Sequence, residues 1–127
     1  YERADFSVKL YGAIIYAEHV RGALQQREDR KNITGRFTML TSTDEKQDQY
    51  LEVNIEIARG VKKSAVLSQH LTEIITRELI KKNSEYHNNY LSMHERVVPR
   101  VSLWTYEDPK YFKSGVKQRW VIKQKNS

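Results

Sequence analysis

The stretch from Tyr50 to Ala58 constrains the fold more than any other part of this sequence. Its residues alternate between apolar and polar, so that one side of an extended chain is hydrophobic and the other is not. The apolar side carries Leu51, Val53, Ile55 and Ile57, and the polar side carries Glu52, Asn54 and Glu56. The pattern predicts a strand with one face in a core and both glutamates on the face exposed to solvent.

Three further segments alternate in the same way and are predicted to be strands: Asp5–Tyr11, Gly35–Thr43 and Arg100–Tyr106. The first is closed by Gly12, which ends the alternation. The charged segment Ser42–Gln49 lacks apolar residues and lies between two of the predicted strands. It is typical of a hairpin tip, so the strands on either side of it are expected to pair antiparallel.

Two segments change to helical spacing: Ala17 to about Arg27, and Ser64–Lys82, which could extend towards Tyr90. Two other segments are interpreted as connectors, Ala13–Tyr16 and Asn83–Arg96. The resulting order is strand, helix, strand, strand, helix, strand. It predicts an α+β domain of the ferredoxin-like β-α-β-β-α-β type, an antiparallel sheet with two helices on one face. A basic loop follows, and Trp120–Lys123 is expected to add a short edge strand.

The chain has 127 residues, enough for one domain with a modest core. Its net charge of +6 favours anionic partners without choosing among them. There are no cysteines, which excludes a disulfide framework and thiol chemistry and fits a reducing compartment. No apolar run reaches the length of a membrane span, so we expect a cytoplasmic protein without a membrane partner.

Most of the chemistry of an active site is missing from the sequence. The four histidines, His19, His70, His87 and His94, lack the spacing of metal ligands, so no metal site is expected. A glycine-rich phosphate loop and a G-x-S-x-G nucleophile motif are also absent. If the chain takes part in catalysis, it therefore lacks most of an active site.

The most specific patterns lie at the two ends. The segment Arg3–Val20 runs from an arginine and an aspartate through the first strand to Gly12 and into the first helix. At the other end, Gly115-Val116-Lys117-Gln118-Arg119 places a lysine and an arginine after a glycine. Together they resemble the C-terminal domain of adenylate-forming enzymes, the superfamily of acyl-CoA synthetases, peptide-synthetase adenylation domains and luciferases. The phenylacetate–CoA ligase branch is the most similar. The pattern departs from the family at Glu2 and Ala17, which replace its glycine and proline, and at His19 and Arg21, which replace its two glutamates.

The resemblance implies that residues 1–127 form the small, mobile C-terminal domain of a larger acyl-CoA synthetase. The chain begins with Tyr1, as an excised piece would. The partner is then the enzyme's own N-terminal domain, which binds ATP and a carboxylic acid. The full-length enzyme uses ATP with Mg, forms an acyl-adenylate, and makes a thioester with CoA, releasing AMP. This domain alone is expected to be inactive and to bind no cofactor. A carrier protein remains open as the acceptor instead of CoA, and the acyl substrate is not identified.

The resemblance also implies roles for particular residues. Lys117 matches the lysine that bridges the acid and the α-phosphate during adenylation, with Lys113 as the competing assignment. Asp5 matches the hinge about which the domain rotates, and Arg3 matches an arginine that contacts the nucleotide ribose. Gly12 matches a glycine that lines the CoA channel.

Two other functions are compatible with a basic α+β domain. One is an RNA-binding module, because Gly35-Arg36-Phe37-Thr38-Met39 weakly resembles a base-stacking strand. The acidic side chains of Glu52 and Glu56, if exposed on that sheet, would repel phosphate and argue against nucleic acid as a partner. The other is a regulatory or scaffold domain without chemistry.

Overall fold

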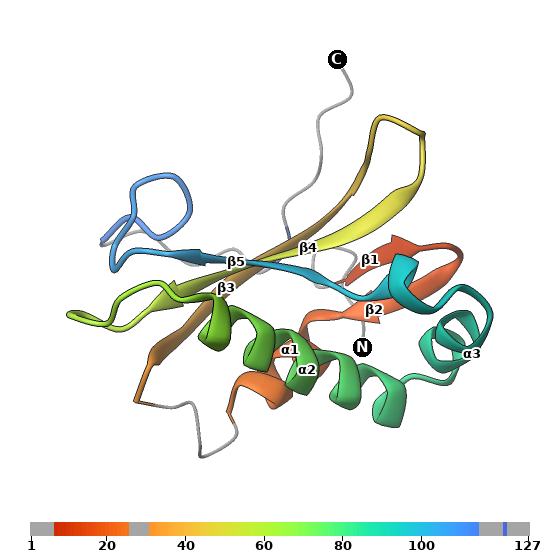
Figure 1. Ribbon diagram of the computed structural model, residues 1–127, viewed down its shortest axis with the longest axis horizontal. Coiled ribbons are helices and arrows are strands. Elements are labelled where there is room, and N and C mark those ends of the chain that lie inside the picture. The colour runs from red at the N-terminus through yellow and green to blue at the C-terminus, as the bar shows by residue number, and fades with distance from the viewer. Residues whose placement is uncertain (1–6, 26–30, 115–120, 122–127) are drawn as a thin grey trace.

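The computed structural model describes residues 7–25, 31–114 and 121. Within these ranges the elements are β1 (Ser7–Leu10), β2 (Ala13–Tyr16), α1 (Ala17–Leu24), β3 (Ile33–Thr43), β4 (Gln49–Ile57), α2 (Ala65–Lys82), α3 (Ser84–Met93), the 3-10 helix η3 (His94–Val97) and β5 (Arg100–Trp104). They form a two-stranded sheet, β1-β2, and a three-stranded sheet, β3-β4-β5. Figure 1 shows α1 and α2 on the same side of the three-stranded sheet. The predicted α+β class is confirmed.

The three-stranded sheet is mixed, whereas the sequence predicted an antiparallel one. Strands β3 and β4 form the expected antiparallel hairpin, but β4 and β5 pair parallel. In the ferredoxin-like plan the first strand would lie between these two. Here β1 instead pairs with β2, which the sequence had suggested was a connector. Strands β4 and β5 thus become neighbours, and the long helical crossover between them lets them run parallel.

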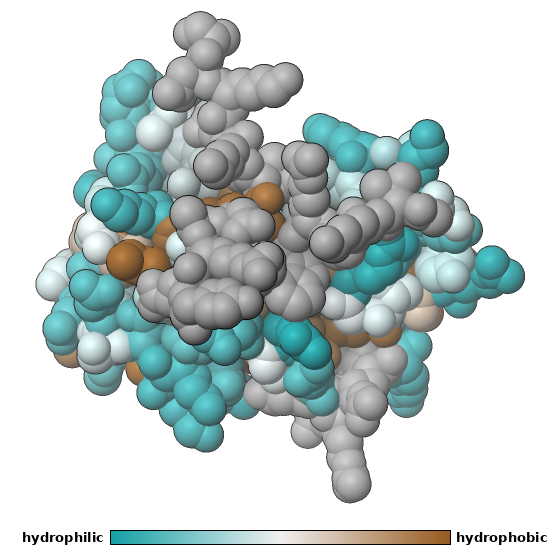
Figure 2. Space-filling model, turned by 180° about the vertical axis from the view of Figure 1, so that it is seen from behind, coloured by the Kyte–Doolittle hydropathy of each residue, from teal (hydrophilic) through white to brown (hydrophobic). Residues whose placement is uncertain are grey.

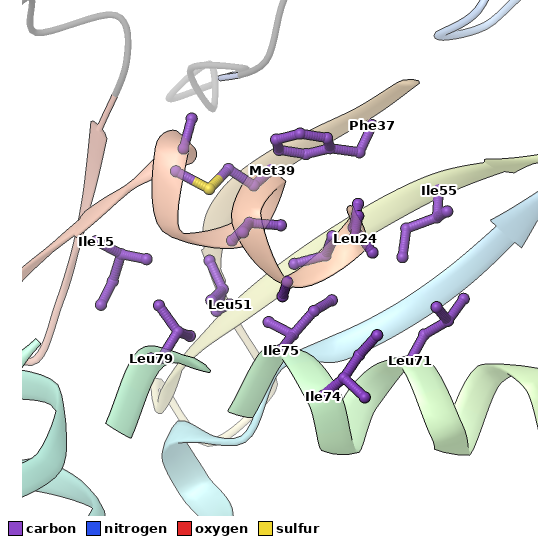
Figure 3. Packing of buried hydrophobic residues seen from close by; sticks show 14 of the residues in the cluster. Ile15, Leu24, Phe37, Met39, Leu51, Ile55, Leu71, Ile74, Ile75 and Leu79 are labelled. Carbon is purple, nitrogen blue, oxygen red and sulfur yellow. The ribbon is translucent and has the colours of Figure 1, made fainter. Parts of the chain in front are cut away.

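The hydrophobic core lies between the sheets and the helices. Figure 3 shows Leu71, Ile74, Ile75 and Leu79 of α2 pointing towards the sheet and α1, where Leu24, Leu51 and Ile55 meet them. All of these residues are at most 3% exposed. The prediction that the apolar side of β4 faces a core is therefore confirmed. Burial of a large aliphatic side chain contributes roughly 1.5–3 kcal/mol, so this layer supplies much of the stability of the fold.

Helix α2 begins where its cap was predicted, because the Ser64 hydroxyl accepts a hydrogen bond from Leu67 N at 3.0 Å. Its predicted end at Lys82 is confirmed, but the helix does not extend towards Tyr90. Asn83 stops α2 and caps a separate helix, α3, by accepting a hydrogen bond from Tyr86 N at 3.0 Å. Its amide also donates to Ile14 O at 2.8 Å, which ties this junction to β2. The segment predicted as a connector is thus mostly helical. The side chain of Asn83 satisfies a backbone N–H at the start of α3 and a backbone carbonyl of β2.

Helix α3 is anchored by a buried tyrosine. The Tyr86 hydroxyl donates to Val97 O at 2.8 Å, and the residue is fully buried. Burial raises the pKa of this phenol well above its usual range, so it remains a hydrogen-bond donor.

The surface is mainly hydrophilic in the described areas of Figure 2. No helix in residues 7–25 and 31–114 is long and apolar enough to cross a membrane.

Candidate functional site

The sequence placed its candidate site at the two ends of the chain. Arg3, Asp5 and Lys117 lie outside the described residues, so their predicted roles as ribose contact, hinge and adenylation lysine stay predictions. Gly12 and Lys113 are described, and each belongs to a well-defined region. Gly12 lies in the turn between β1 and β2. Lys113 lies near the end of the loop formed by residues 105–114, called here the 105–114 loop.

The β1–β2 turn has the backbone of a tight two-residue hairpin. Tyr11 and Gly12 both have positive φ, 49° and 83° respectively. Glycine adopts such values without the penalty that a Cβ imposes, which explains a glycine at the second position. A Cβ built on Gly12 would have no heavy atom within 4 Å, apart from its chain neighbours. The turn is thus open to approach from outside, and its conformation, not crowding within the chain, requires the glycine.

Other elements hold the β1–β2 turn in place. Tyr11 N donates to Gln49 Oε1 at 2.7 Å, and the Tyr11 hydroxyl donates to Gln49 O at 3.1 Å. From α3, the Asn89 amide donates to Tyr11 O at 3.1 Å and to Leu10 O at 3.4 Å. The turn is therefore attached to both the three-stranded sheet and α3. Its open side faces outward on a supported backbone.

The 105–114 loop has its own internal order. Asp108 N donates to Thr105 O at 3.1 Å, and Phe112 N donates to Asp108 O at 2.7 Å. The Asp108 carboxylate accepts from Lys110 N at 3.0 Å. Just before the loop, the Trp104 ring packs edge-on against Tyr111, with centroids 5.0 Å apart. Successive turns of this kind give a compact loop that ends at Lys113 and Ser114.

Polar residues on the far face of the sheet hold this loop. Trp104 Nε1 donates to Asn54 Oδ1 at 2.7 Å, and Glu107 N donates to Glu56 Oε2 at 2.6 Å. Asn54 and Glu56 are both fully buried. The sequence expectation that Glu56 is exposed is wrong, because the loop brings a backbone donor onto its carboxylate. Glu52 is partly buried and accepts from the Asn54 amide at 3.0 Å.

Arg36 connects the sheet to the end of the loop. Its Nη1 donates to Phe112 O at 3.2 Å and its Nη2 to Lys113 O at 3.4 Å. The guanidinium also lies over the Phe112 ring, 5.6 Å from the centroid, and 3.6 Å from Glu56 Oε2. Phe112 is fully buried whereas Lys113 is exposed. The backbone at Lys113 is thus held while its side chain is free to meet solvent.

Sequence reasoning did not select Arg36 or Glu56. The signal that could have found them is the Thr34-Gly35-Arg36 triplet at the start of β3. The pairing with β4 shifts between Ile33 and Phe37, and Gly35 has a φ of 94° in this bulge. The bulge lets Thr34 and Arg36 both reach Glu56, which the Thr34 hydroxyl contacts at 2.6 Å.

The RNA-binding alternative loses the aromatic ring that its predicted strand would offer to bases. Phe37, the ring of the predicted stacking strand, is fully buried in the hydrophobic core with Met39. Trp104, on the opposite face, is engaged by Asn54 and Tyr111. Bases would need exposed rings to stack on. Within the described part of the chain, no group of three or more His, Cys, Asp or Glu side chains could hold a metal ion.

The β1–β2 turn and the 105–114 loop lie at opposite ends of the view in Figure 1, the turn on the right and the loop on the left. The β1–β2 turn and the 105–114 loop are therefore not brought together into one site on this domain.

Comparison with known proteins finds similarity in structure. No family model and no curated protein matches the sequence. Among solved structures, a domain of phenylacetate-coenzyme A ligase from Bacteroides vulgatus ATCC 8482 matches 97% of this chain and 98% of its own, with 20% identity and a TM-score of 0.56. Brucella canis acyl-CoA synthetase matches 84% of this chain, which corresponds to 16% of its own length, with 15% identity and a TM-score of 0.48. The chain thus shares the fold of a domain of an acid–CoA ligase.

Proposed function

We propose that this chain is the mobile C-terminal domain of an acyl-CoA synthetase of the phenylacetate–CoA ligase type. The observation that carries the proposal is the fold match with a phenylacetate-coenzyme A ligase domain, which covers nearly all of both chains. The sequence patterns at the two ends, around Gly12 and Lys117, support it independently. The larger N-terminal domain of the same enzyme would bind ATP and the carboxylic acid.

The first half-reaction joins the acid to AMP. A carboxylate oxygen attacks the α-phosphorus of ATP, and the bond to the β-phosphate oxygen breaks, so that pyrophosphate leaves. Negative charge is concentrated where the two anions meet, and a preorganised cation there lowers the barrier. Lys117 would supply this cation, with Lys113 as the alternative. Arg3 would contact the ribose of the nucleotide. The exit of the 105–114 loop, with its backbone held by Arg36, is a suitable support for such a lysine.

The second half-reaction forms the thioester. The thiol of CoA loses its proton, its sulfur attacks the acyl carbonyl carbon, and AMP leaves. The open β1–β2 turn would line the path of the thiol arm, because Gly12 leaves the backbone accessible. This turn and the 105–114 loop lie at opposite ends of the view in Figure 1, which supports a rotation of the domain between the two steps. Asp5 would be the hinge that absorbs the change in dihedral angles.

The proposal is tested by measuring the two half-reactions separately in the complete ligase that carries this domain. Lys117→Ala should lower acyl-adenylate formation by at least about 100-fold, because a fixed cation of this kind contributes several kcal/mol. Thioester formation from supplied acyl-adenylate should stay close to wild type. Lys113→Ala is the matched variant that decides between the two lysines, and Lys63→Ala, at an exposed position before α2, is the control. If neither Lys117→Ala nor Lys113→Ala slows adenylation, the proposed lysine supply is wrong.

A further inference from the structure

We propose that Arg36 and Glu56 form a clamp that positions the 105–114 loop, which carries Lys113 and precedes Lys117 in the sequence, for the adenylation half-reaction. This inference rests on the function proposed above for that segment. Arg36 and Glu56 are positioning residues here, since they act through the backbone of the loop. Neither belongs to the pattern by which the sequence resembles adenylate-forming enzymes.

In the carboxylate half of the clamp, hydrogen bonds hold the side chain of Glu56 in one orientation. Glu56 is fully buried, and a buried carboxylate is costly unless donors surround it. Its Oε1 accepts from the Thr34 hydroxyl at 2.6 Å, and its Oε2 accepts from Glu107 N at 2.6 Å and lies 3.6 Å from Arg36 Nη1. The donors come from β3 and from the 105–114 loop. Glu56 therefore joins the start of the loop to the sheet through a charge-assisted bond.

The backbone of the loop at this contact is one that needs support. Glu107 has a φ of 58°, in the left-handed region that few residues other than glycine adopt. Its N–H is the group that donates to Glu56. A residue held in a sparsely populated conformation persists where the surrounding structure over-determines it. The Glu56 carboxylate supplies that constraint, so removing it releases Glu107 towards other conformations.

The guanidinium half holds the end of the loop. A planar guanidinium can donate to two acceptors at once, and Arg36 uses this fork on the adjacent carbonyls of Phe112 and Lys113. The ring of Phe112 packs beneath the same group. A lysine would keep the charge but could not reproduce the paired contacts. The side chain of Arg36 therefore holds the backbone of Phe112 and Lys113 at the end of the loop.

The site of attachment is close in sequence to the proposed catalytic lysine. Lys117 follows Lys113 by four residues, and four residues of extended chain span at most about 14 Å. Holding the backbone at Lys113 therefore restricts the volume that the Lys117 amine can search. Adenylation requires that amine in one place, and small displacements of a positioned group reduce rates strongly. The clamp thus affects the step that uses the lysine and leaves the thioester step to the β1–β2 turn.

Two conservative variants test the clamp in the complete ligase. Arg36→Lys keeps the charge without the fork, and Glu56→Gln keeps the shape without the charge. Each should lower acyl-adenylate formation by about tenfold or more, while thioester formation from supplied acyl-adenylate changes less than about twofold. Arg100→Lys is the matched control, since Arg100 lies over the Tyr50 ring at 4.0 Å and pairs with Asp44 at 3.8 Å. It should leave both half-reactions unchanged.

Amide hydrogen exchange of the 127-residue chain gives a second measurement that does not depend on the reaction. In Glu56→Gln, the amide of Glu107 should exchange about tenfold faster than in the wild type. The amide of Val53 within β4 serves as the internal reference and should change little. Unchanged exchange at Glu107 would show that Glu56 does not hold the loop, and the proposal would be abandoned.

The half-reactions separate the clamp from the function on which it rests. If both steps fall together in Arg36→Lys and Glu56→Gln, the pair only stabilises the fold and the positioning role is wrong. If adenylation is unchanged in these variants but stops in Lys117→Ala or Lys113→Ala, the clamp is wrong and the proposed function stands. If neither lysine matters, the proposed lysine supply fails and the positioning role fails with it.

Discussion

On one side of β4, Leu51, Val53 and Ile55 are buried in the hydrophobic core. Their aliphatic side chains pack against other apolar groups and need no particular partner. On its other side, Asn54 and Glu56 are equally buried, but each depends on named donors and acceptors at 2.6–3.3 Å. Hydrophobic contact is non-directional and contributes mainly to stability. Buried hydrogen bonds contribute less net free energy but determine where groups lie. We infer that the helix side stabilises the domain and that the far side positions its loop.

The largest expected effect comes from disturbing the helix side. Ile55→Ala should lower the free energy of unfolding by about 2–5 kcal/mol, because the residue is fully buried and its truncation leaves a cavity. Urea denaturation followed by circular dichroism measures the change. Val66→Ala is the matched control, since Val66 is 80% exposed and alanine suits a helix better than valine. A loss below about 1 kcal/mol in Ile55→Ala would contradict the view that this layer carries the stability.

The second prediction tests whether the far side is directional. Asn54→Leu keeps the approximate size but leaves Trp104 Nε1 without its acceptor, and it should cost about 1–3 kcal/mol. Trp104→Phe removes the donor instead. The double variant has no unpaired donor. Its loss of unfolding free energy should therefore be smaller than the sum of the losses in the two single variants, by a coupling of about 0.5–3 kcal/mol. Strict additivity in urea denaturation would mean that the Asn54–Trp104 bond is not what holds this position.

The same contrast explains what could be predicted from the sequence. Alternation along β4 and helical spacing along α2 are local, so β1, β3, β4, β5, the two main helices and the apolar face were predicted correctly, whereas β2 was predicted to be a connector. The burial of Glu56 was missed because it depends on Glu107, 51 residues away. The parallel pairing of β4 with β5 was missed because Tyr11 and Gly12 form a turn that moves β1 into its own hairpin. Both errors concern contacts between distant segments, which local periodicity does not encode.

The candidate site shows the same division. Gly12 could be selected from the sequence because its neighbours match a family pattern, and its positive φ gives that glycine a physical reason. Arg36 carries no such pattern. A lone arginine on a strand is normally a solvated charge, and only the bulge at Gly35 and the position of Phe112 make it a contact for the loop.

The third prediction concerns the β1–β2 turn, which is held by hydrogen bonds between Tyr11 and the side chains of Gln49 and Asn89. Gly12→Ala should cost about 1–2 kcal/mol, because a φ of 83° is strained for alanine while a Cβ there meets no other atom. Gly12→Asn should cost less, since asparagine tolerates positive φ. Thermal unfolding of the two variants gives the comparison. Equal losses in both variants would contradict the view that the backbone conformation at this position requires the glycine.

The smallest expected effect sharpens the comparison between two arginine–carboxylate pairs. Arg36 and Glu56 meet where the side chains are 30% and 0% exposed, whereas Arg100 and Asp44 meet at 59% and 29%, 3.8 Å apart. Exposed pairs contribute about 0–1 kcal/mol and are screened by salt. Asp44→Asn removes the charge and retains an oxygen that can accept from Lys46 N and Asp48 N in the hairpin turn. Its cost should be below about 1 kcal/mol in low salt and should vanish near 1 M NaCl, while the cost of Glu56→Gln should persist there. A salt-independent loss in Asp44→Asn would show that Asp44 acts through the turn and that exposure does not separate the two pairs.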